Sequence, residues 1–526
     1  MRRLAVFLLA VLLLSGCAAQ PEPEPEEDWN LYQQEQPQEP AEQPEQPETV
    51  YPAAFSLAYH RGQTLDPVTC AGGIQEDVAA LLYEPLFRLD GAFQPEPVLC
   101  ESWEGDASGT VCTLTVRAEA HFSDGSPLTA EDVAETLRRA MASERYGYRL
   151  RRVASVSASR AGQVVVVLTE PDRGLTALLD IPIVKRGTQD ELVPTGSGPY
   201  RFASWEGEAR LEADPDWWQG GALPAAVLPL VHAKDQDSAR YLFSTRRVEL
   251  LRVDPTEDLT AVAGQYVAAY QPTTLLQFIG FNTRQGLFAD AAARRAFSQA
   301  IPRETLAGAQ MAGLAQAAQF PFSPLSPLYP ADLERPYDRE ASAAALAALL
   351  PAAGEGAEGS EEAGGRTLSL LVNEEDAFRL TSARFIAGSL SVGGWTVEVR
   401  TLPWEAYLLA LEAGDFDLYF GEVRLTANWD LTDLAGTGGA LNYGGWTDPE
   451  TDALLAAFAA GEDRTAGARA LAARLMAEAP LAPVCFRSYT VLTHLGVVQG
   501  LSPSPSSPFG DLEDWTIRLR GAGGAS

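Results

Sequence analysis

Side chains that commonly do chemistry are few and scattered in this sequence. The four histidines form no H-E-x-x-H motif and no close pair, which tells against a histidine metal site. No G-x-S-x-G or S-x-x-K motif lies in a strand–turn–helix setting that would expose a nucleophilic serine. Carboxylates are numerous and most should be solvated, although counting them does not exclude a paired acid–base site. We expect no catalytic residue, no metal ion and no cofactor; the histidines are His60, His121, His232 and His494.

The cysteines allow two interpretations. Cys70, Cys100, Cys112 and Cys485 follow the N-terminal Cys17, and no C-x-x-C motif indicates a zinc ribbon or a redox pair. In an exported chain four cysteines permit three full pairings, and Cys100 and Cys112 flank an expected hairpin across which they could meet. Alternatively, all four are small, buried apolar residues. The sequence alone leaves both interpretations open.

The N-terminus is organised like an export signal. After Arg2 and Arg3, residues 4–14 form an apolar run of a signal peptide's length, too short to span a bilayer. Small residues then precede Cys17, and this arrangement resembles the lipobox of bacterial lipoproteins. The resemblance implies cleavage before Cys17, acyl chains on its sulfur and new amino group, and a lipid anchor on the extracytoplasmic face of a bacterial cell membrane. The alternative is an ordinary signal peptide with an unrelated cysteine.

Composition separates a tether from a globular body. Residues 17–49 are dominated by Pro, Glu and Gln, and such a segment buries too little apolar surface to offset its ordering entropy. The whole chain is 46% hydrophobic, so a core can form in the remainder. No second apolar run reaches the length of about 18 residues that a membrane span needs. The formal net charge of −32 argues against nucleic acid or anionic lipid as a binding partner.

Residues 122–133 (FSDGSPLTAEDV) combine a strand end, a turn and a helix start. The alternation in residues 113–117 predicts a strand that leads to this segment, and its D-G pair signals a tight turn. Thr129 has the position of an N-cap, with Asp132 at the capping-box position of a helix over residues 130–141. We interpret the segment as scaffold without chemistry of its own.

The order of several short motifs resembles that of a known family. The family is family 5 of the bacterial extracellular solute-binding proteins, the oligopeptide-, dipeptide- and nickel-binding components of ABC importers. Each motif is short, but their shared order along nearly the whole body tells against coincidence. The motifs are LDP at 65–67, LYEPL at 82–86, SWE at 102–104, FSDGSPLTAEDV at 122–133, TGSGPY at 195–200, FN at 281–282 and FDLYF at 416–420.

Strands alternate with helices along the body, which predicts α/β layers. The resemblance implies a two-lobed, periplasmic-binding-protein-like (type II) fold, with an extra subdomain in a discontinuous first lobe and a ligand enclosed when the lobes close. It also implies that an ABC permease and its ATPase subunits are the partners of a monomeric binding protein. The expected parts are a signal peptide (1–16), a lipidated tether (17–49), lobe I (50–87, 188–271 and 488–526), its extra subdomain (88–187) and lobe II (272–487).

The segment after the FDLYF motif is where this chain departs from the family. In the family, an aspartate a little beyond this strand pairs with the amino terminus of a bound peptide. Residues 422–430 (EVRLTANWD) carry no aspartate in that register; Asp430 is the nearest, and Glu422 could substitute for it. The departure marks this segment as the place that decides the ligand.

Six residues are candidates for ligand contact. Arg424 could pair bidentately with a carboxylate, and Trp429 could stack on a ligand. Trp404 falls where the family often has an aromatic residue that faces the cleft. For each of these residues, ordinary packing or surface pairing is an equally good alternative. The candidate ligand-binding residues are Trp404, Glu422, Arg424, Asn428, Trp429 and Asp430.

These patterns lead to one expected function and two alternatives. We expect a lipid-anchored solute-binding protein of an ABC importer, which captures a small peptide or similar solute and delivers it to the permease, and not an enzyme. The alternatives are a secreted hydrolase on an α/β frame and a surface receptor that senses its ligand without importing it. The missing nucleophile and metal motifs tell against the hydrolase. The sequence does not distinguish import from sensing.

Overall fold

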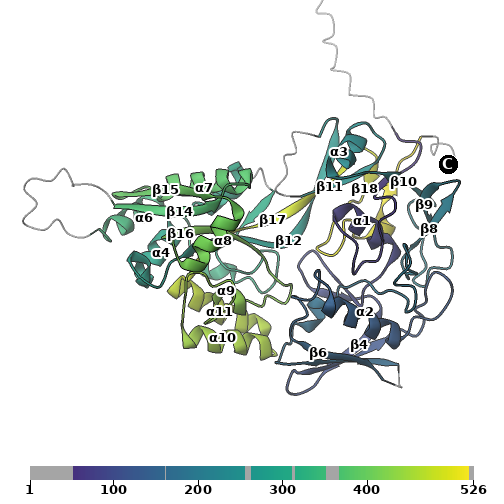
Figure 1. The fold of residues 1–526 in the computed structure, drawn as a ribbon, viewed down its shortest axis with the longest axis horizontal. Helices are drawn as coiled ribbons and strands as arrows, with labels where there is room; N and C mark the ends of the chain where they lie inside the picture. The colour runs from purple at the N-terminus through teal and green to yellow at the C-terminus, as the bar shows by residue number, and fades with distance from the viewer. Residues whose placement is uncertain (1–50, 160–161, 255–261, 311–313, 351–365, 521–526) are drawn as a thin grey trace, which may run out of the picture. The chain divides into compact units, whose positions relative to one another are not determined.

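The architecture comes from a computed structural model that describes residues 51–159, 162–254, 262–310, 314–350 and 366–520. The expected signal peptide, the tether and Cys17 lie outside the described residues. Within these ranges, three sheets of four or more strands carry the fold, each beside its own apolar core (Figure 1). No helix of the described residues is long and apolar enough to cross a membrane.

The first sheet joins segments from both sides of residues 88–187. Its four strands have the order β1 (Leu57–Tyr59), β10 (Val227–His232), β9 (Glu208–Ala213) and β8 (Tyr200–Trp205). β1 runs parallel to β10, and the other neighbours are antiparallel. Helix α1 (Gly73–Leu82) packs Val78 and Leu82 into the same core. Burial of such side chains stabilises the fold by about 1.5–3 kcal/mol each.

A second, antiparallel sheet has α2 (Ala130–Ala142) packed against it. β5 and β7 alternate strictly between buried and half-buried residues, as expected when one face of a sheet is covered. The capping box predicted at the start of α2 is confirmed: the Thr129 N–H donates to the Asp132 carboxylate at 2.9 Å. The strand order is β4 (Cys100–Gly105), β5 (Val111–Val116), β7 (Gln163–Leu168) and β6 (Val153–Ala158).

A third, seven-stranded sheet is mixed. β14 is parallel to both β15 and β16, whereas β12 is antiparallel to both β16 and β17. The longest strands are β12 and β17, with 16 and 14 residues. The order is β11 (Leu250–Val253), β17 (Leu481–His494), β12 (Tyr266–Phe281), β16 (Leu418–Arg424), β14 (Arg366–Asn373) and β15 (Trp395–Leu402), with β13 (Ala315–Ala317) paired to β17.

The ladder between β12 and β17 is interrupted near its middle. It is irregular between Pro272 and Leu275, where Pro272 has no N–H to donate. Beside this break, Pro272 is paired with Ser488 and Leu275 with Arg487. The boundaries predicted between the two lobes, after residues 271 and 487, fall at the same place. Because a bulge locally disrupts a ladder, this point is suited to a hinge.

Six helices of the described chain begin at an aspartate N-cap. In each, the aspartate carboxylate accepts a backbone N–H of the first turn. Such caps place negative charge at the positive end of the helix dipole, so part of the acidic surplus stabilises helix starts. The helices are α3 (Gln236–Ser244), α4 (Ala291–Gln299), α6 (Arg339–Ala347), α7 (Ala377–Leu390), α10 (Pro449–Ala460) and α11 (Arg464–Glu478).

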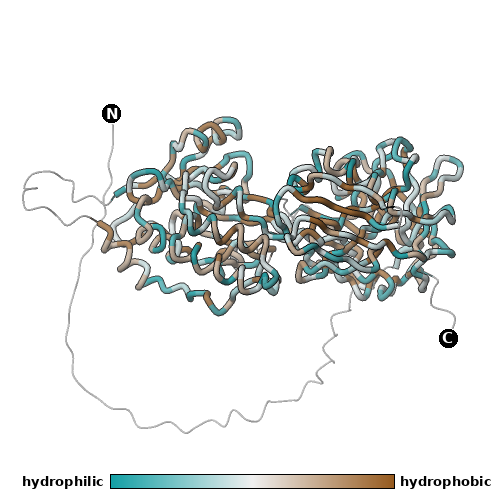
Figure 2. Tube along the Cα trace, turned by 90° about the horizontal axis from the view of Figure 1, so that it is seen from below, coloured by the Kyte–Doolittle hydropathy of each residue, from teal (hydrophilic) through white to brown (hydrophobic). Residues whose placement is uncertain are grey.

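Short elements complete the connections between these layers. Helices α7 and α8 lie against β14 and β15 (Figure 1). Apolar residues concentrate along the inner strands, whereas many loops are polar (Figure 2). The remaining elements are β2 (Phe87–Leu89), β3 (Pro95–Pro97), η2 (Leu175–Leu178), η4 (Leu287–Ala289), α5 (Arg303–Thr305), η5 (Leu306–Gln310), η6 (Ala331–Leu333), α8 (Trp404–Ala413), α9 (Thr432–Ala435), β18 (Val498–Gln499), η7 (Leu512–Asp514) and β19 (Thr516–Ile517).

Cys70, Cys100 and Cys112 are free thiols, and all four described cysteines are buried. In the β4–β5 hairpin Cys100 is opposite Val116 and Cys112 is opposite Gly105, so the two thiols lie toward opposite ends of the ladder. The disulfide interpretation is therefore wrong for this pair, and the interpretation as buried apolar residues holds. Burial raises the pKa of Cys70 and of Cys112 to about 11, which keeps both thiols protonated at neutral pH.

Glu249 is a buried acid close to His494. Its side chain is 2% exposed, and its Oε2 lies 3.8 Å from His494 Nε2 without a hydrogen-bond partner among the described residues. Burial raises the pKa of Glu249 to about 7, against the lowering influence of Arg246. Burial also lowers the pKa of His494. The folded state therefore keeps a proton on Glu249 at pH values where the unfolded chain has lost it.

We predict that Glu249→Gln flattens the dependence of stability on pH. The folded pKa of about 7 lies above the ordinary value of 4.5. The stabilising contribution is therefore complete below pH 4.5 and is lost as the pH rises through about 7. A shift of this size corresponds to about 3 kcal/mol. Thermal unfolding across this window should show a fall in wild-type stability that the variant lacks. Glu208→Gln, on exposed β9 surface, is the control, and an equal fall in all three proteins would contradict the assignment.

Candidate functional site

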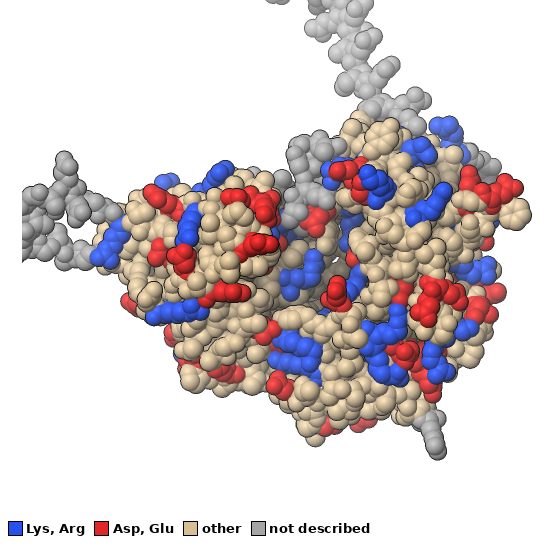
Figure 3. Space-filling view, in the orientation of Figure 1, with Lys and Arg blue, Asp and Glu red and all other residues tan. Residues whose placement is uncertain are grey.

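A cavity of about 520 Å³ is lined by residues from distant parts of the chain. Helix α1, strand β2 and residues 145–149 contribute to it, as does the β12 segment at the ladder break. Residues 424–427, Tyr489 of β17 and residues 505–513 complete the lining. Figure 3 shows a hollow with basic and acidic side chains around it. The seven-stranded sheet and the elements around α1 thus share one cavity.

The two carboxylates that α1 contributes to this cavity are engaged by arginines. Arg252 of β11 contacts Glu76 at 3.0 Å and Asp77 at 2.6 Å, and Arg145 contacts Glu76 at 2.9 Å. Burial by itself raises the pKa of Glu76, but Arg145 and Arg252 outweigh it and lower the value. Removing one partner would leave a buried charge uncompensated. On this side of the cavity, two arginines therefore compensate the two carboxylates of α1.

Glu84 is another buried carboxylate at the cavity. Its oxygens accept hydrogen bonds from the indole N–H groups of Trp217 at 3.1 Å and Trp218 at 2.6 Å, and from the side-chain amide of Gln219 at 2.6 Å. Burial raises its pKa in spite of these donors. Three donors occupy this carboxylate, so Glu84 holds the segment after β9 in place.

Arg424, at the end of β16, is the candidate residue that lines the cavity. Its Nη2 donates to the hydroxyl of Tyr489 at 3.0 Å. The Arg424 guanidinium carbon lies 5.8 Å from the Tyr489 ring centroid, and that of Arg252 lies 5.0 Å from it. No carboxylate of the described residues is within 4 Å of the Arg424 guanidinium, so its remaining N–H groups are available.

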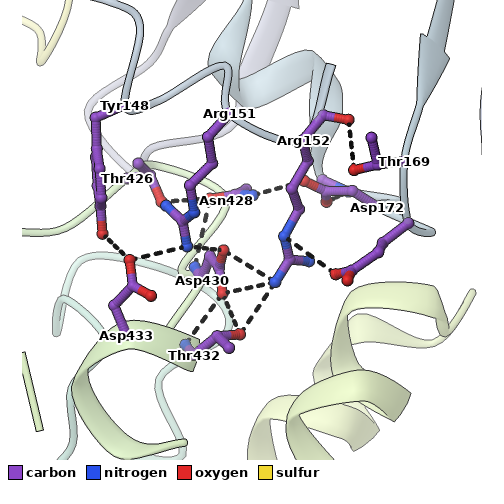
Figure 4. Close-up of polar contacts among 12 residues, drawn as sticks. Tyr148, Arg151, Arg152, Thr169, Asp172, Thr426, Asn428, Asp430, Thr432 and Asp433 are labelled. Atoms are coloured by element: carbon purple, nitrogen blue, oxygen red, sulfur yellow. Dashed lines mark hydrogen bonds and ion pairs between the residues drawn. The ribbon is translucent and has the colours of Figure 1, made fainter. Parts of the chain in front are cut away.

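Asp430 belongs to a cluster that joins residues 148–152 to residues 430–433 (Figure 4). Its carboxylate accepts from Arg151 at 2.7 Å and from Arg152 at 3.1 Å, and its side chain is 8% exposed. Tyr148, which also lines the cavity, donates to Asp433 at 2.7 Å. We call these residues, with Thr432, the Asp430 cluster. Two guanidinium groups already neutralise this carboxylate.

Asn428 and Trp429 are buried next to the Asp430 cluster. Asn428 Nδ2 donates to Asp172 Oδ2 at 2.7 Å. The Trp429 ring is 1% exposed and meets Phe93 and Phe486 at centroid distances of 5.3 and 5.9 Å. Trp429 has φ 59°, a conformation uncommon for a large side chain, so the packing around it holds the backbone there. Its position does not fit the expectation that it stacks on a ligand.

Glu422 and Trp404 also lie outside the cavity lining. Glu422 accepts from the Gln277 amide and from the Arg487 guanidinium, each at 3.0 Å. Trp404 begins α8, is 45% exposed, and stacks on Tyr407 with ring centroids 5.8 Å apart. Of the six candidates, the cavity lining therefore includes one, Arg424.

Sequence reasoning missed most of the cavity. Arg88, Arg145, Arg252 and Tyr489 line it, and none of them stands in a motif singled out from the sequence. They come from separate elements, so their spacing carried no signal. Residues 83–85 of the LYEPL motif line it too, so that motif did contain usable information.

Comparisons of the sequence identify relatives. The family described as "Bacterial extracellular solute-binding proteins, family 5 Middle" matches residues 94–442, more than half of the chain. The oligopeptide-binding protein AppA of Bacillus subtilis (strain 168) is 24% identical over 409 residues, covering 72% of this chain and 75% of AppA. The glutathione-binding protein GsiB of Escherichia coli (strain K12) is 25% identical over 271 residues, covering 48% of this chain and 53% of GsiB.

A solved structure has the same fold. The unliganded open form of the periplasmic murein tripeptide binding protein MppA matches with a TM-score of 0.72 at 19% identity, over 90% of this chain and 99% of MppA. The expected two-lobed α/β fold is thereby confirmed. The hydrolase alternative is wrong, because family 5 proteins bind solutes and are not enzymes. The chain belongs to family 5 of the bacterial extracellular solute-binding proteins, the extracytoplasmic substrate-binding components of ABC importers.

Proposed function

We propose that this chain is a lipid-anchored solute-binding protein that captures a small peptide or similar solute between its two lobes and delivers it to an ABC permease. The observation that carries the proposal is the cavity of about 520 Å³, to which α1 and β2 contribute together with residues 424–427 and Tyr489. Sites for small molecules typically have volumes of about 300–1,000 Å³. The tyrosines and arginines in the lining offer both aromatic surface and directional hydrogen bonds.

In this proposal, the lobes close because one solute contacts elements of both lobes. A solute that touches α1 or β2 and also residues 424–427 gains its full interaction free energy only when these two parts of the cavity lining both contact it. Binding therefore shifts the population towards a closed arrangement. The break in the β12–β17 ladder at Pro272 supports a hinge there, because the pairing is already irregular at that point.

The six candidate residues take two roles in this proposal. Arg424 contacts the solute because it lines the cavity, and Trp404 offers exposed aromatic surface on α8, where the family often has an aromatic residue that faces the cleft. The other four are positioning residues, since their polar groups or ring faces are occupied by the chain itself. These four are Glu422, Asn428, Trp429 and Asp430.

Membrane attachment in this proposal depends on Cys17 and the tether that follows it. An acyl chain contributes about 0.8 kcal/mol per buried methylene, so several chains hold a protein firmly at a membrane. Residues 17–49 are rich in proline and in acidic residues, a composition typical of extended linkers, and such a linker would let an anchored body reach a permease.

Purified residues 50–526 should bind a solute and release it unchanged. Protein from cells grown in peptide-rich medium is analysed by native mass spectrometry, and the bound compound is identified after denaturation. Adding solute should reduce the radius of gyration in small-angle X-ray scattering, because closure brings the lobes together. Conversion of the bound compound to a product, or no bound solute at any peptide concentration, would contradict the proposal.

Cys17→Ser should release the protein from the membrane, because a serine provides no thiol for acylation. The measurements are membrane fractionation and metabolic labelling with a clickable fatty acid. Cys70→Ser, which alters a buried thiol of the body, is the matched control and should keep the label. The lipid anchor would be refuted by a Cys17→Ser protein that stays labelled and membrane-bound.

Trp429→Ala should lower the stability of the protein, whereas Trp404→Ala should weaken solute binding. Removing the buried Trp429 indole leaves a cavity in the core and should lower the free energy of unfolding by about 3–5 kcal/mol. Removing the exposed Trp404 ring should cost about 0.5 kcal/mol or less but weaken solute binding. Chemical denaturation and calorimetric titration separate the two effects. If Trp429→Ala weakened binding without loss of stability, its assignment to the core would fail.

A further inference from the structure

The cavity has arginines whose charge no acid of the described chain compensates. We propose that it binds a carboxylate-bearing solute through Arg88 and Arg424, and that a free amino group on the solute is not required. This inference rests on the proposed function as a solute-binding protein and names the class of solute. It departs from the arrangement in which an aspartate beyond the FDLYF motif meets a peptide's amino terminus.

Asp430 is not available as a partner for an ammonium group. Its Oδ2 accepts a hydrogen bond from Arg151 at 2.7 Å and lies 3.1 Å from Arg152 Nη2 (Figure 4). Its Oδ1 accepts from the hydroxyl of Thr432 at 2.7 Å and from the backbone N–H of Thr432 at 3.1 Å. A ligand cation would have to displace an arginine from a largely buried carboxylate. The displaced guanidinium would then lack its counter-charge, which is unfavourable away from water.

Most carboxylates that line the cavity are also engaged. Glu76 and Asp77 pair with arginines, Asp180 pairs with Arg149, and Glu84 accepts three N–H donors. The remaining one, Glu513, is exposed on η7, as Arg424 is on β16, and has no ion pair within 4 Å among the described residues. The cavity therefore has two unpaired arginines against one unpaired carboxylate, and of these three groups Arg88 is the one that is half-buried.

Arg88 and Arg424 are in the opposite situation. Both line the cavity, and neither has an ion pair within 4 Å among the described residues. Acidic residues outnumber basic ones by 71 to 39, so these arginines are not unpaired for lack of acids in the chain. Arg88 is half-buried on β2, and the Tyr489 hydroxyl holds the exposed Arg424. A guanidinium fork fits a carboxylate with two parallel hydrogen bonds.

The two arginines stand on elements that are far apart in the chain. Arg88 belongs to β2, within the predicted subdomain, whereas Arg424 ends β16 in predicted lobe II. A carboxylate-bearing solute that reaches both groups would favour closure, because each contact alone is weaker than the two together. The same residues would then provide both specificity for an anion and coupling between binding and closure.

The test uses the full-length lipoprotein in detergent and a synthetic tripeptide library prepared in free, N-acetylated, C-amidated and doubly blocked forms. Binding is measured by affinity selection and mass spectrometry. N-acetylated members should bind as well as free ones, whereas C-amidation should weaken binding about tenfold or more. Loss of binding on N-acetylation, or indifference to amidation, would overturn the inference and leave the proposed function standing. Failure of every form to bind would contradict the peptide-like solute itself, and the inference with it.

Arginine variants connect this preference to the two side chains. Arg424→Gln and Arg88→Gln should each weaken binding of N-acetylated peptides about tenfold, yet change binding of the amidated forms little. Arg424→Lys should restore part of the affinity, because it keeps the charge but not the fork. Arg400→Gln, which removes an arginine paired with Asp415 outside the cavity, is the matched control. Unchanged binding in both Arg424→Gln and Arg88→Gln would overturn the assignment.

Asp430→Asn tests the claim that Asp430 does not bind an amino group of the solute. The variant alters the Asp430 cluster and could change affinity for every form, so the informative quantity is a ratio. The affinity of free peptides relative to N-acetylated ones should stay the same as in the wild type. A shift of this ratio towards the N-acetylated forms would mean that Asp430 meets the amino group, and the inference would be wrong.

Discussion

The antiparallel pairing of β12 with β17 is the interaction on which the rest of the structure depends. β11 and β13 pair with β17, and β16 pairs with β12, so the seven-stranded sheet is assembled around this ladder. In this ladder the cavity residues Gln271 and Tyr489 are opposite each other, and in the neighbouring β12–β16 ladder the cavity residue Arg424 is opposite Leu275. The break at Pro272 lies between these two pairs. A local disruption of pairing therefore lies beside residues that line the cavity.

A second constraint is that buried ions need partners. This chain carries a formal net charge of −32, and it places many carboxylates at helix caps or against arginines. The Glu76–Asp77–Arg252 contacts and the Asp430 cluster both follow this rule, because a desolvated carboxylate without a partner is costly. Once these pairs are formed, Arg88 and Arg424 remain as uncompensated groups at the cavity. The charge of the cavity lining thus depends on which ions the fold pairs as well as on which residues the sequence contains.

Much of the fold could be predicted from sequence, whereas little of the site could. The motif order identified the family, and the capping box at Thr129 and Asp132 was correct, because such features depend on neighbours within a few residues. The choice between a disulfide and buried thiols for Cys100 and Cys112 depended on the hairpin register, which no local pattern specifies. Among the candidate contacts, Arg424 reached the cavity, but Trp429 packs against phenylalanines from other segments.

By itself, then, the sequence indicated the family through the order of its motifs, the α/β layers through short-range periodicity, and the start of α2 through its capping box. Only the tertiary structure decided which charges meet. Arg151 and Asp430 are 279 positions apart, and Arg252 and Tyr489 come from different strands, so no spacing rule could have paired them. An aspartate near the expected ligand register therefore became part of an internal ion cluster, and an arginine six residues before it became the group that faces the cavity. The physical reason is that each ion takes the nearest favourable partner in space, and packing sets that distance.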